Sequence, residues 1–146
     1  MSMQPLTGGC FCGAIRYHVA EVFDSGYCHC SVCRRISGAP AIAWANVLSD
    51  RFKLTRGSPR SYASSERYVR CFCAECGTHC YTIGRDDPEM VSVNTGTLDQ
   101  PELVPPRVHI WTQNRLAWFD IRDELPRFAE GTTPHPASPH PASGEK

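Results

Sequence analysis

Seven of the nine cysteines in this chain fall into three tight clusters. The clusters are a Cys-x-Cys pair at Cys10 and Cys12, a Cys-x-Cys-x-x-Cys triplet at Cys28, Cys30 and Cys33, and a Cys-x-x-Cys pair at Cys73 and Cys76. A tetrahedral zinc ion takes four thiolates in a structural site, or three thiolates and an exchangeable ligand in a catalytic site. Seven thiolates therefore divide naturally into a closed site of four and an open site of three.

The two pairs are the natural ligands of the closed site. A Cys-x-x-Cys turn presents both of its thiolates to one metal ion, and Gly77 follows Cys76 where such a turn often needs a positive φ. On an extended strand, Cys10 and Cys12 would project from the same face. A zinc ion shared by the two pairs would close a loop of about 60 residues and so stabilise the fold.

The triplet offers three thiolates within six residues, and no residue next to it is an obvious fourth ligand. His29 lies between two of the cysteines and is expected to point away from the metal, as a surface or packing residue. Asp24 is near in sequence, but thiolate-bound zinc prefers softer ligands than a carboxylate. Two interpretations stay open: the fourth position is exchangeable, or Cys71 or Cys80 closes it. Either of these two cysteines could instead be a buried, inert thiol.

An open site of this composition favours one kind of chemistry. Zinc with three thiolates carries a net charge of −1, so it generates hydroxide from bound water poorly. It can still bind a substrate thiol as the thiolate or polarise a carbonyl oxygen, and chemistry at sulfur therefore fits better than hydrolysis. Arg34 and Arg35 directly follow Cys33. They could offset the negative charge and bind substrate carboxylates, or they could form a solvent-facing pair.

The elements that must position these cysteines are mostly short strands. Apolar residues alternate with polar ones at Ile15, Tyr17 and Val19, and similar strand patterns occupy Ala41–Val47, Tyr68–Phe72, Met90–Val93, Arg107–Trp111 and Leu116–Phe119. No segment shows a long helical period. Residues 29–36 could form a helical turn before Gly38, and Asp123–Glu130 contains Pro126, so it forms at most a short turn. The pattern predicts a mainly β domain with irregular zinc loops.

The chain of 146 residues is expected to contain one domain, over residues 1–131, followed by a tail over residues 132–146. The tail contains Pro-His-Pro-Ala-Ser twice in tandem, and this composition offers too little apolar surface to offset the entropy of ordering. His135 and His140 in the repeats could bind a metal weakly, but a solvated tail is the favoured interpretation.

Composition excludes several classes of function. The 15 basic and 15 acidic residues give a formal net charge of zero, so the chain lacks the field of a general nucleic-acid binder. The N-terminus has no signal-peptide pattern, and no apolar run approaches the length that spans a bilayer, so no membrane partner is expected. We therefore expect a cytoplasmic protein, in which clustered cysteines indicate metal or catalysis, and a disulfide framework is the minor alternative.

The cysteine motifs, in this order, resemble the family of glutathione-dependent formaldehyde-activating (Gfa) enzymes. The matching segments are Gly-Cys-Phe-Cys-Gly-Ala-Ile-Arg-Tyr ending at Tyr17, Cys-His-Cys-Ser-Val-Cys-Arg-Arg-Ile-Ser-Gly-Ala-Pro ending at Pro40, and Arg-Cys-Phe-Cys-Ala-Glu-Cys-Gly-Thr ending at Thr78. Thr95–Asp99, His109–Trp111 and Asp123–Phe128 also resemble the C-terminal half of the family, so the resemblance extends from about Thr7 to Phe128.

The resemblance implies a small mainly β fold of short antiparallel strands with two zinc ions, shared with centromere protein V and with a family of Rab exchange factors. It implies a structural site at the two cysteine pairs and a catalytic site at Cys28, Cys30 and Cys33, with Arg34 and Arg35 neutralising glutathione carboxylates. The implied activity is the reversible condensation of glutathione with formaldehyde to S-hydroxymethylglutathione, a carbon–sulfur lyase reaction. His109 and Trp111 belong to a matched segment, and the simplest expectation is a strand with Val108 and Ile110 facing the core.

Three functions are therefore weighed. The first is a zinc-dependent carbon–sulfur lyase that acts on adducts of a small-molecule thiol and an aldehyde. The second is a non-catalytic protein-interaction module with two zinc ions, which requires Cys71 or Cys80 to close the second site. The third, a zinc-ribbon nucleic-acid binder, is disfavoured by the zero net charge. The identity of the thiol and the aldehyde, and the oligomeric state, do not follow from the residues.

Overall fold

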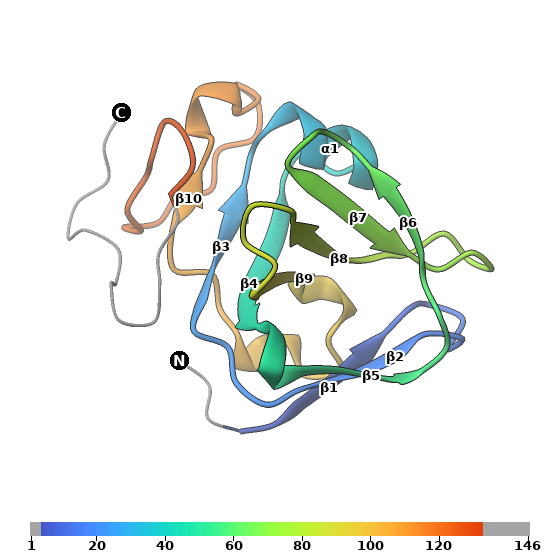
Figure 1. Cartoon of the computed structure of the whole chain (residues 1–146). Helices are drawn as coiled ribbons and strands as arrows, with labels where there is room; N and C mark the ends of the chain where they lie inside the picture. The colour runs from blue at the N-terminus through green and yellow to red at the C-terminus, as the bar shows by residue number, and fades with distance from the viewer. Residues whose placement is uncertain (1–3, 133–146) are drawn as a thin grey trace.

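The computed structural model describes residues 4–132, which form two β-sheets joined by a common core (Figure 1). The smaller sheet has three antiparallel strands in the order β1-β2-β5, with bounds β1 (Leu6–Gly9), β2 (Arg16–Val19) and β5 (Phe52–Arg56). It runs along the bottom of Figure 1, and the larger sheet stands above it. The predicted mainly β architecture is therefore confirmed.

The larger sheet has seven strands in the order β10-β3-β4-β9-β8-β7-β6. Their bounds are β10 (His109–Ile110), β3 (Asp24–Cys28), β4 (Ile42–Leu48), β9 (Met90–Asn94), β8 (His79–Gly84), β7 (Tyr68–Phe72) and β6 (Arg60–Ala63). Every neighbouring pair is antiparallel except β10 and β3, which are parallel. The expectation of antiparallel strands thus holds apart from this one pair.

One α-helix and several 3₁₀ turns complete the described fold. Helix α1 (Ser31–Ser37) follows the cysteine triplet and ends at Gly38, which takes a left-handed conformation with φ 74°. The predicted helical turn before Gly38 is therefore confirmed. The helix ends at glycine because this residue adopts the left-handed conformation without a steric penalty. The 3₁₀ turns are η1 (Ser49–Arg51), η2 (Thr95–Thr97), η3 (Pro101–Leu103) and η4 (Thr112–Asn114).

The main core lies between the two sheets. Side chains alternate along each strand of the larger sheet, so successive residues face opposite sides of it. On β4, Ala45 and Val47 are fully buried in the main core, and on β9 the equivalent residues are Val91 and Val93. Tyr17 and Phe52 of the smaller sheet stack on each other, and Phe52 also packs against Tyr81 of β8. Contacts of this kind hold the two sheets together.

The opposite face of the larger sheet is covered by a second, smaller apolar cluster. Its buried members are Cys28, Cys33, Trp44, Val108 and Phe128, which come from β3, α1, β4 and the C-terminal part of the described chain. The C-terminal part is held in place by backbone hydrogen bonds, with N–H of Phe128 donating to His109 C=O over 2.9 Å. This covering layer turns a sheet face that would meet solvent into the wall of an internal site.

The strand predictions are confirmed in the central sheet and wrong near the C-terminus. Strands form at four of the predicted patterns, as β2, β4, β7 and β9, and the predicted strand at 107–111 is reduced to His109–Ile110. It ends there because Trp111 takes a left-handed conformation with φ 57°. Residues 116–119 form a turn rather than a strand, and residues 123–130 contain no helix.

Five further strands, β1, β3, β5, β6 and β8, were not predicted from the sequence pattern. Strand β3 shows why, because Ser25 and Gly26 are poor strand formers taken alone. A Cβ at Gly26 would lie 2.6 Å from Trp44 Cζ2, so this position needs glycine for the close approach of β4. Tertiary pairing with β4 and β10 therefore decides this strand.

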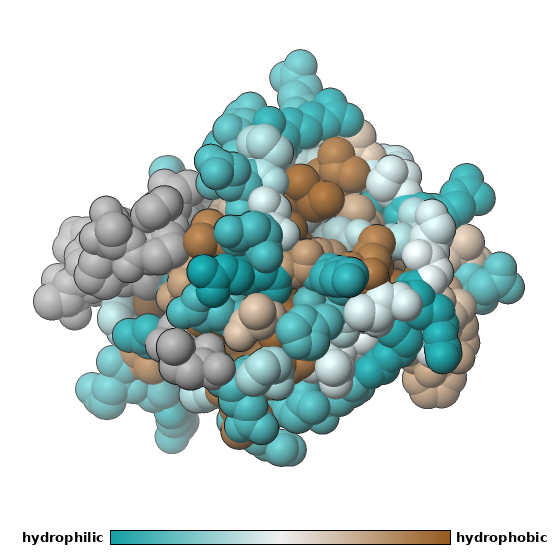
Figure 2. Space-filling view, turned by 60° about the horizontal axis from the view of Figure 1, so that its bottom comes forward, coloured by the Kyte–Doolittle hydropathy of each residue, from teal (hydrophilic) through white to brown (hydrophobic). Residues whose placement is uncertain are grey.

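The molecular surface is mainly polar, as expected from the sequence. Figure 2 shows a face that is mainly hydrophilic, with apolar groups visible only in small areas between polar side chains. In the described part of the chain, no helix has the length and apolar character needed to cross a membrane. The proposed tail, including His135 and His140, lies outside the described residues except for Thr132.

Candidate metal centres and the cavity beside them

The two cysteine pairs come together in one cluster. Cys10 and Cys12 follow β1, Cys73 and Cys76 follow β7, and the four Sγ atoms all lie within 4.8 Å of one another. Sγ of Cys12 is 3.7 Å from that of Cys10 and 3.8 Å from that of Cys73. Four sulfurs bound tetrahedrally to one ion at about 2.3 Å would be about 3.8 Å apart. The donor set and these spacings therefore fit a structural zinc ion.

Each pair is held by a tight backbone turn. N–H of Gly13 donates to Cys10 C=O, and N–H of Gly77 donates to Cys73 C=O. Gly13 and Gly77 have φ of 83° and 81°, and the positive φ expected at Gly77 is confirmed. The expectation that Cys10 and Cys12 lie on an extended strand is wrong, since β1 ends at Gly9 and the pair forms a turn. The turn still brings the two sulfurs together.

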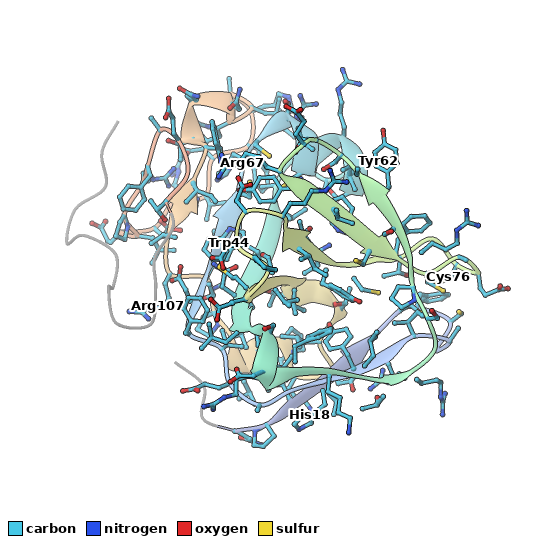
Figure 3. The ribbon with its side chains drawn as sticks, in the orientation of Figure 1. His18, Trp44, Tyr62, Arg67, Cys76 and Arg107 are labelled. Carbon is cyan, nitrogen blue, oxygen red and sulfur yellow. The ribbon has the colours of Figure 1, made fainter. Side chains whose placement is uncertain are left out.

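Hydrogen bonds to sulfur prepare this cluster for a cation. Backbone N–H of Ile15 donates to Cys10 Sγ over 3.2 Å, and the Thr78 hydroxyl lies 3.2 Å from Cys76 Sγ. Hydrogen bonds from Thr78, first from its side chain and then from its backbone, lower the pKa of Cys76 to about 5. Donors of this kind favour thiolates, the form in which cysteine binds metal. Figure 3 places Cys76 at the edge of the molecule.

The cysteine triplet forms a second, separate cluster. Cys28 ends β3, Cys30 caps the N-terminus of α1 and Cys33 lies in the first turn of that helix. Their Sγ atoms lie within 4.8 Å of one another, and N–H of Cys33 donates to Cys30 Sγ over 3.2 Å. Hydrogen bonds with Cys28 and then Cys33 lower the pKa of Cys30, whereas those with Cys30 and Cys33, followed by burial, raise the pKa of Cys28. All three can be thiolates together only around a cation.

Cys71 and Cys80 join neither cluster among residues 4–132. Both are buried in the main core, where burial raises the pKa of Cys71 and raises that of Cys80 to about 12. These thiols are therefore inert packing residues, as one of the interpretations of the sequence held. The closed second site that a purely structural module requires is not formed within the described residues.

The triplet, unlike the four-cysteine cluster, faces a cavity of about 150 Å³. Cys28, Cys30 and Cys33 all line it, and Trp44, Ile110 and Trp111 supply part of its apolar wall. Figure 3 shows Trp44 of β4 near the middle of the molecule. A larger depression over residues 120–127 holds charged side chains and no cysteine, so it offers no comparable metal chemistry.

A polar row forms another wall of this cavity. Asn46, Ser92, Thr82 and Arg70 are cross-strand partners in register on β4, β9, β8 and β7, and all four line the cavity. Directly paired residues project from the same face of a sheet. The alternation that sends apolar side chains into the main core therefore sends this row toward the cysteine triplet.

Arg70 is the member of the row that contacts the triplet. Its side chain is buried, with 7% of the residue exposed, and Nη1 lies 3.6 Å from Cys33 Sγ. Nε donates to Ser64 Oγ over 2.9 Å, and Nη1 lies 3.5 Å from Thr82 Oγ1. These contacts fix the guanidinium beside the sulfur, where its positive charge favours the thiolate.

Asn94 and His79 extend the polar network behind the row. Nδ2 of Asn94 donates to His79 C=O over 2.8 Å and lies 3.1 Å from His79 Nδ1. Burial, followed by the charge of Arg70, lowers the pKa of His79 to about 4, so its ring is neutral at pH 7. Nε2 lies 3.2 Å from Tyr81 C=O and must carry the proton, so Nδ1 accepts from Asn94. The Asn94 amide is thereby held with its nitrogen on His79.

The arginines predicted to bind carboxylates lie outside the cavity. Arg34 is half-buried and Arg35 is exposed, and neither lines the cavity beside the triplet. Nε of Arg34 has no hydrogen-bond partner within residues 4–132. Their contact with a substrate stays a prediction, for a part of the substrate outside the cavity.

His29 and His109 are both fully buried. The expectation of a packing role for His29 is therefore met. As expected, Val108 is buried in the smaller apolar cluster and Ile110 packs against that cluster, and Ile110 and Trp111 also line the cavity. The short parallel pairing of β10 with β3 turns this segment toward the triplet.

Sequence reasoning missed Arg70 and the rest of the polar row. Strand alternation alone separates Arg70 from Val69 and Cys71, so it could have assigned Arg70 to the opposite face. The prediction would then have been that Arg70 is exposed to solvent, because no local sequence pattern indicates that α1 and residues 108–128 cover this face. The long-range covering layer makes the row part of a site.

Comparisons with known proteins agree with these features. Residues 5–114 match the family profile described as “Glutathione-dependent formaldehyde-activating enzyme”. A curated Halomonas elongata protein named “Putative glutathione-dependent formaldehyde-activating enzyme” is 27% identical over 127 residues, which cover 80% of each chain. A crystal structure of a Rhodobacter sphaeroides protein superposes with a TM-score of 0.56 at 29% identity, covering 69% of this chain and 92% of that one.

Proposed function

The chain belongs to the family of glutathione-dependent formaldehyde-activating enzymes, and from this we propose that it is a zinc-dependent carbon–sulfur lyase. Its substrate would be the adduct of a thiol and an aldehyde, with glutathione and formaldehyde as the first pair to test. Cys10, Cys12, Cys73 and Cys76 would hold a structural zinc ion, and Cys28, Cys30 and Cys33 a catalytic one. A cytoplasmic location is part of this proposal, because thiols that bind zinc must stay reduced.

The observation that carries this proposal is the different surroundings of the two cysteine clusters. The four-cysteine cluster provides a full set of ligands and does not line the cavity. The triplet provides three ligands, all of which line the cavity, and no fourth Cys, His, Asp or Glu of residues 4–132 completes it. Zinc sites with three protein ligands keep a position for water or substrate. Chemistry is therefore assigned to the triplet.

Adduct formation requires a thiolate, a polarised carbonyl group and restricted access of water. A zinc ion held by the triplet would favour the thiolate form of the substrate thiol and polarise a carbonyl oxygen. The substrate sulfur bonds to the carbonyl carbon, the π pair moves to oxygen, and oxygen takes up the proton lost by the thiol. Trp44, Ile110 and Trp111 limit water at this place. Arg70 opposes the negative charge of the sulfurs through its contact with Cys33.

Arg34 and Arg35 are assigned to the part of the thiol that stays outside the cavity. The cavity of about 150 Å³ holds only about five water-sized groups, so it takes the reacting end of a tripeptide and not all of it. Two guanidinium groups on α1, just beyond Cys33, suit a carboxylate at the mouth. Arg35 is exposed, so this contribution is expected to be small and weakened by salt.

The test is the rate at which glutathione and formaldehyde exchange with their adduct. Zinc-loaded protein should raise the exchange rate, measured by NMR magnetisation transfer, above that of a protein-free mixture. Cys33→Ser should bind one zinc ion fewer and lose the acceleration, because it removes a ligand of the triplet. The matched control is Cys71→Ser, which changes a buried cysteine outside both clusters. This variant should keep both zinc ions and the acceleration.

Two results would contradict the proposal. Equal exchange rates with and without fully zinc-loaded protein would remove glutathione and formaldehyde as substrates. Retention of both zinc ions by the Cys33→Ser protein would remove the triplet as the catalytic metal site.

A further inference from the structure

The cavity contains a buried cation but no acid. Arg70 is 93% buried, and none of the described residues that line the cavity is Asp or Glu. We propose that Arg70, with Asn46 and Ser92 in the same polar row, forms a subsite for a carboxylate carried by the substrate that reacts at the cysteine triplet. The inference rests on the proposed function for taking that substrate to be a thiol or an aldehyde.

The donors of Arg70 are arranged for a ligand. A guanidinium has five N–H groups. Nε uses one on Ser64, and Nη1 is directed at Cys33 and Thr82. Nη2 has no hydrogen-bond partner within residues 4–132, which leaves its two N–H groups for a ligand. Because Ser64 and Thr82 already fix the group, binding an anion costs little further side-chain entropy.

The rest of the row supplies a second, independent observation. Asn46 is only 6% exposed and lines the cavity, yet its side chain has no hydrogen-bond partner in the part of the chain that the structure describes. Ser92 lies beside it in register, on the side toward Thr82 and Arg70. An amide in the wall of a cavity offers a donor and an acceptor to a polar ligand, and hydrogen bonding with one would satisfy both.

Trp44 adds another donor on the same side. It pairs with Asn94 one row away, lines the cavity, and its Nε1 is buried without a partner in the described chain. The described residues that line the cavity therefore present N–H groups from a guanidinium, an amide and an indole, and include no carboxylate. Such a surface complements a ligand rich in anionic oxygen.

Neutralisation of the cysteine sulfurs does not account for all of these groups. Zinc with three thiolates has a charge of −1, which the single charge of Arg70 would offset. That role needs only the contact between Nη1 and Cys33. It leaves Nη2 and the Asn46 side chain unexplained, and it predicts no preference for a carboxylate in the substrate.

The carboxylate could belong to either reactant, so the experiment has two arms on the zinc-loaded protein. In the first arm, dissociation constants of 3-mercaptopropionate and 2-mercaptoethanol are measured by calorimetry. In the second arm, with 2-mercaptoethanol saturating, glyoxylate is compared with glycolaldehyde. Because the two thiols differ in acidity, the quantity compared between proteins is the ratio of the two constants. The proteins are wild type, Arg70→Gln, Arg70→Lys and the control Arg51→Gln, which changes an exposed arginine that does not line the cavity.

The expected result is a preference for the carboxylate that is about tenfold larger in wild type than in Arg70→Gln, in at least one arm. Arg70→Lys should keep part of the preference, since it keeps the charge but loses the fork. Arg51→Gln should leave the ratio within about twofold. The arm that responds identifies the reactant that carries the carboxylate.

An unchanged ratio in Arg70→Gln, or no preference in either arm for wild type, overturns the subsite. Zinc content is measured in each protein, and if Arg70→Gln holds less than wild type, Arg70→Lys and Asn46→Leu replace it in the comparison. These are binding measurements, so they separate the subsite from the lyase proposal. A carboxylate preference without accelerated adduct exchange would keep the subsite and reject the proposed reaction.

Discussion

Nε2 of His29 lies 2.9 Å from Nδ1 of His109, and both rings are fully buried beside the cysteine triplet. On its other side, Nε2 of His109 lies 2.9 Å from Asp123 Oδ2. An ionised carboxylate only accepts, so Nε2 of His109 carries the proton, and its Nδ1 accepts from Nε2–H of His29. His29, which lies between Cys28 and Cys30, is thus anchored to a segment more than 70 residues away, and this is a physical reason for the short β10–β3 pairing.

Replacing His109 by Phe should destabilise the protein by about 2–3 kcal/mol. Phe keeps the stacking on Tyr27, where the ring centroids are 4.9 Å apart, but it removes the partner of the buried His29 donor and the hydrogen bond to Asp123 Oδ2. The measurement is urea unfolding of the zinc-loaded protein. Asp123→Asn, which keeps an acceptor, should cost about 1 kcal/mol or less. A His109→Phe protein as stable as Asp123→Asn would contradict the hydrogen-bond chain.

Replacing Gly77 by Ala should cost about 1 kcal/mol, because φ is 81° at this turn. The cost is purely conformational, since a Cβ at Gly77 would meet nothing within 4 Å. Gly96 is a matched control: a Cβ there also meets nothing within 4 Å, and its φ is not positive. Thermal unfolding should therefore show a loss for Gly77→Ala and little change for Gly96→Ala. Equal effects of the two substitutions would show that the turn does not depend on the glycine.

The two cysteine clusters should respond differently to loss of a ligand. Cys12 and Cys73 are 61 residues apart in sequence, so Cys73→Ser should release a crosslink across a long loop and lower stability by about 4 kcal/mol. Cys33→Ser should lose one zinc ion and activity while the fold persists, because α1 stays joined to β3 and β4 through the chain and the covering layer. Zinc content and near-ultraviolet circular dichroism distinguish the two cases. Comparable unfolding of both variants would refute a structural role for only one cluster.

His79 should make the stability of the protein depend on pH. Burial, followed by the charge of Arg70, lowers the pKa of His79 to about 4 from the ordinary value of 6.5. Between these values the unfolded chain binds a proton that the folded chain does not, so this contribution is complete above about pH 6.5 and is lost as the pH falls toward 4. In His79→Gln the decrease over this window should be smaller by on the order of 2 kcal/mol.

The measurement is a series of denaturant unfolding curves from pH 7 to pH 4.5 at constant zinc. His29, whose pKa is also lowered to about 4 by burial and then by His109, is present in both proteins. Its contribution therefore cancels in the difference between wild type and His79→Gln. Parallel pH profiles for the two proteins would show that His79 titrates normally in the folded state.

The sequence by itself identified the three cysteine clusters and the family. Cysteines two or three residues apart are brought together by local backbone geometry, so the spacing within each cysteine motif is informative without a fold. The same holds for the glycines at 38 and 77, where local turns require a positive φ. The sequence could not decide between an open and a closed triplet, because Cys71 and Cys80 are close to Cys73 and Cys76 along the chain.

Only the tertiary structure decided what faces the triplet. It placed Cys71 and Cys80 in the main core, and it placed Arg70 3.6 Å from Cys33. These results depend on strand order and on the layer formed by α1 and residues 108–128, which pair residues far apart in sequence. Burial of a strand face is a property of whatever covers it, and no local pattern in Tyr68–Phe72 records that cover.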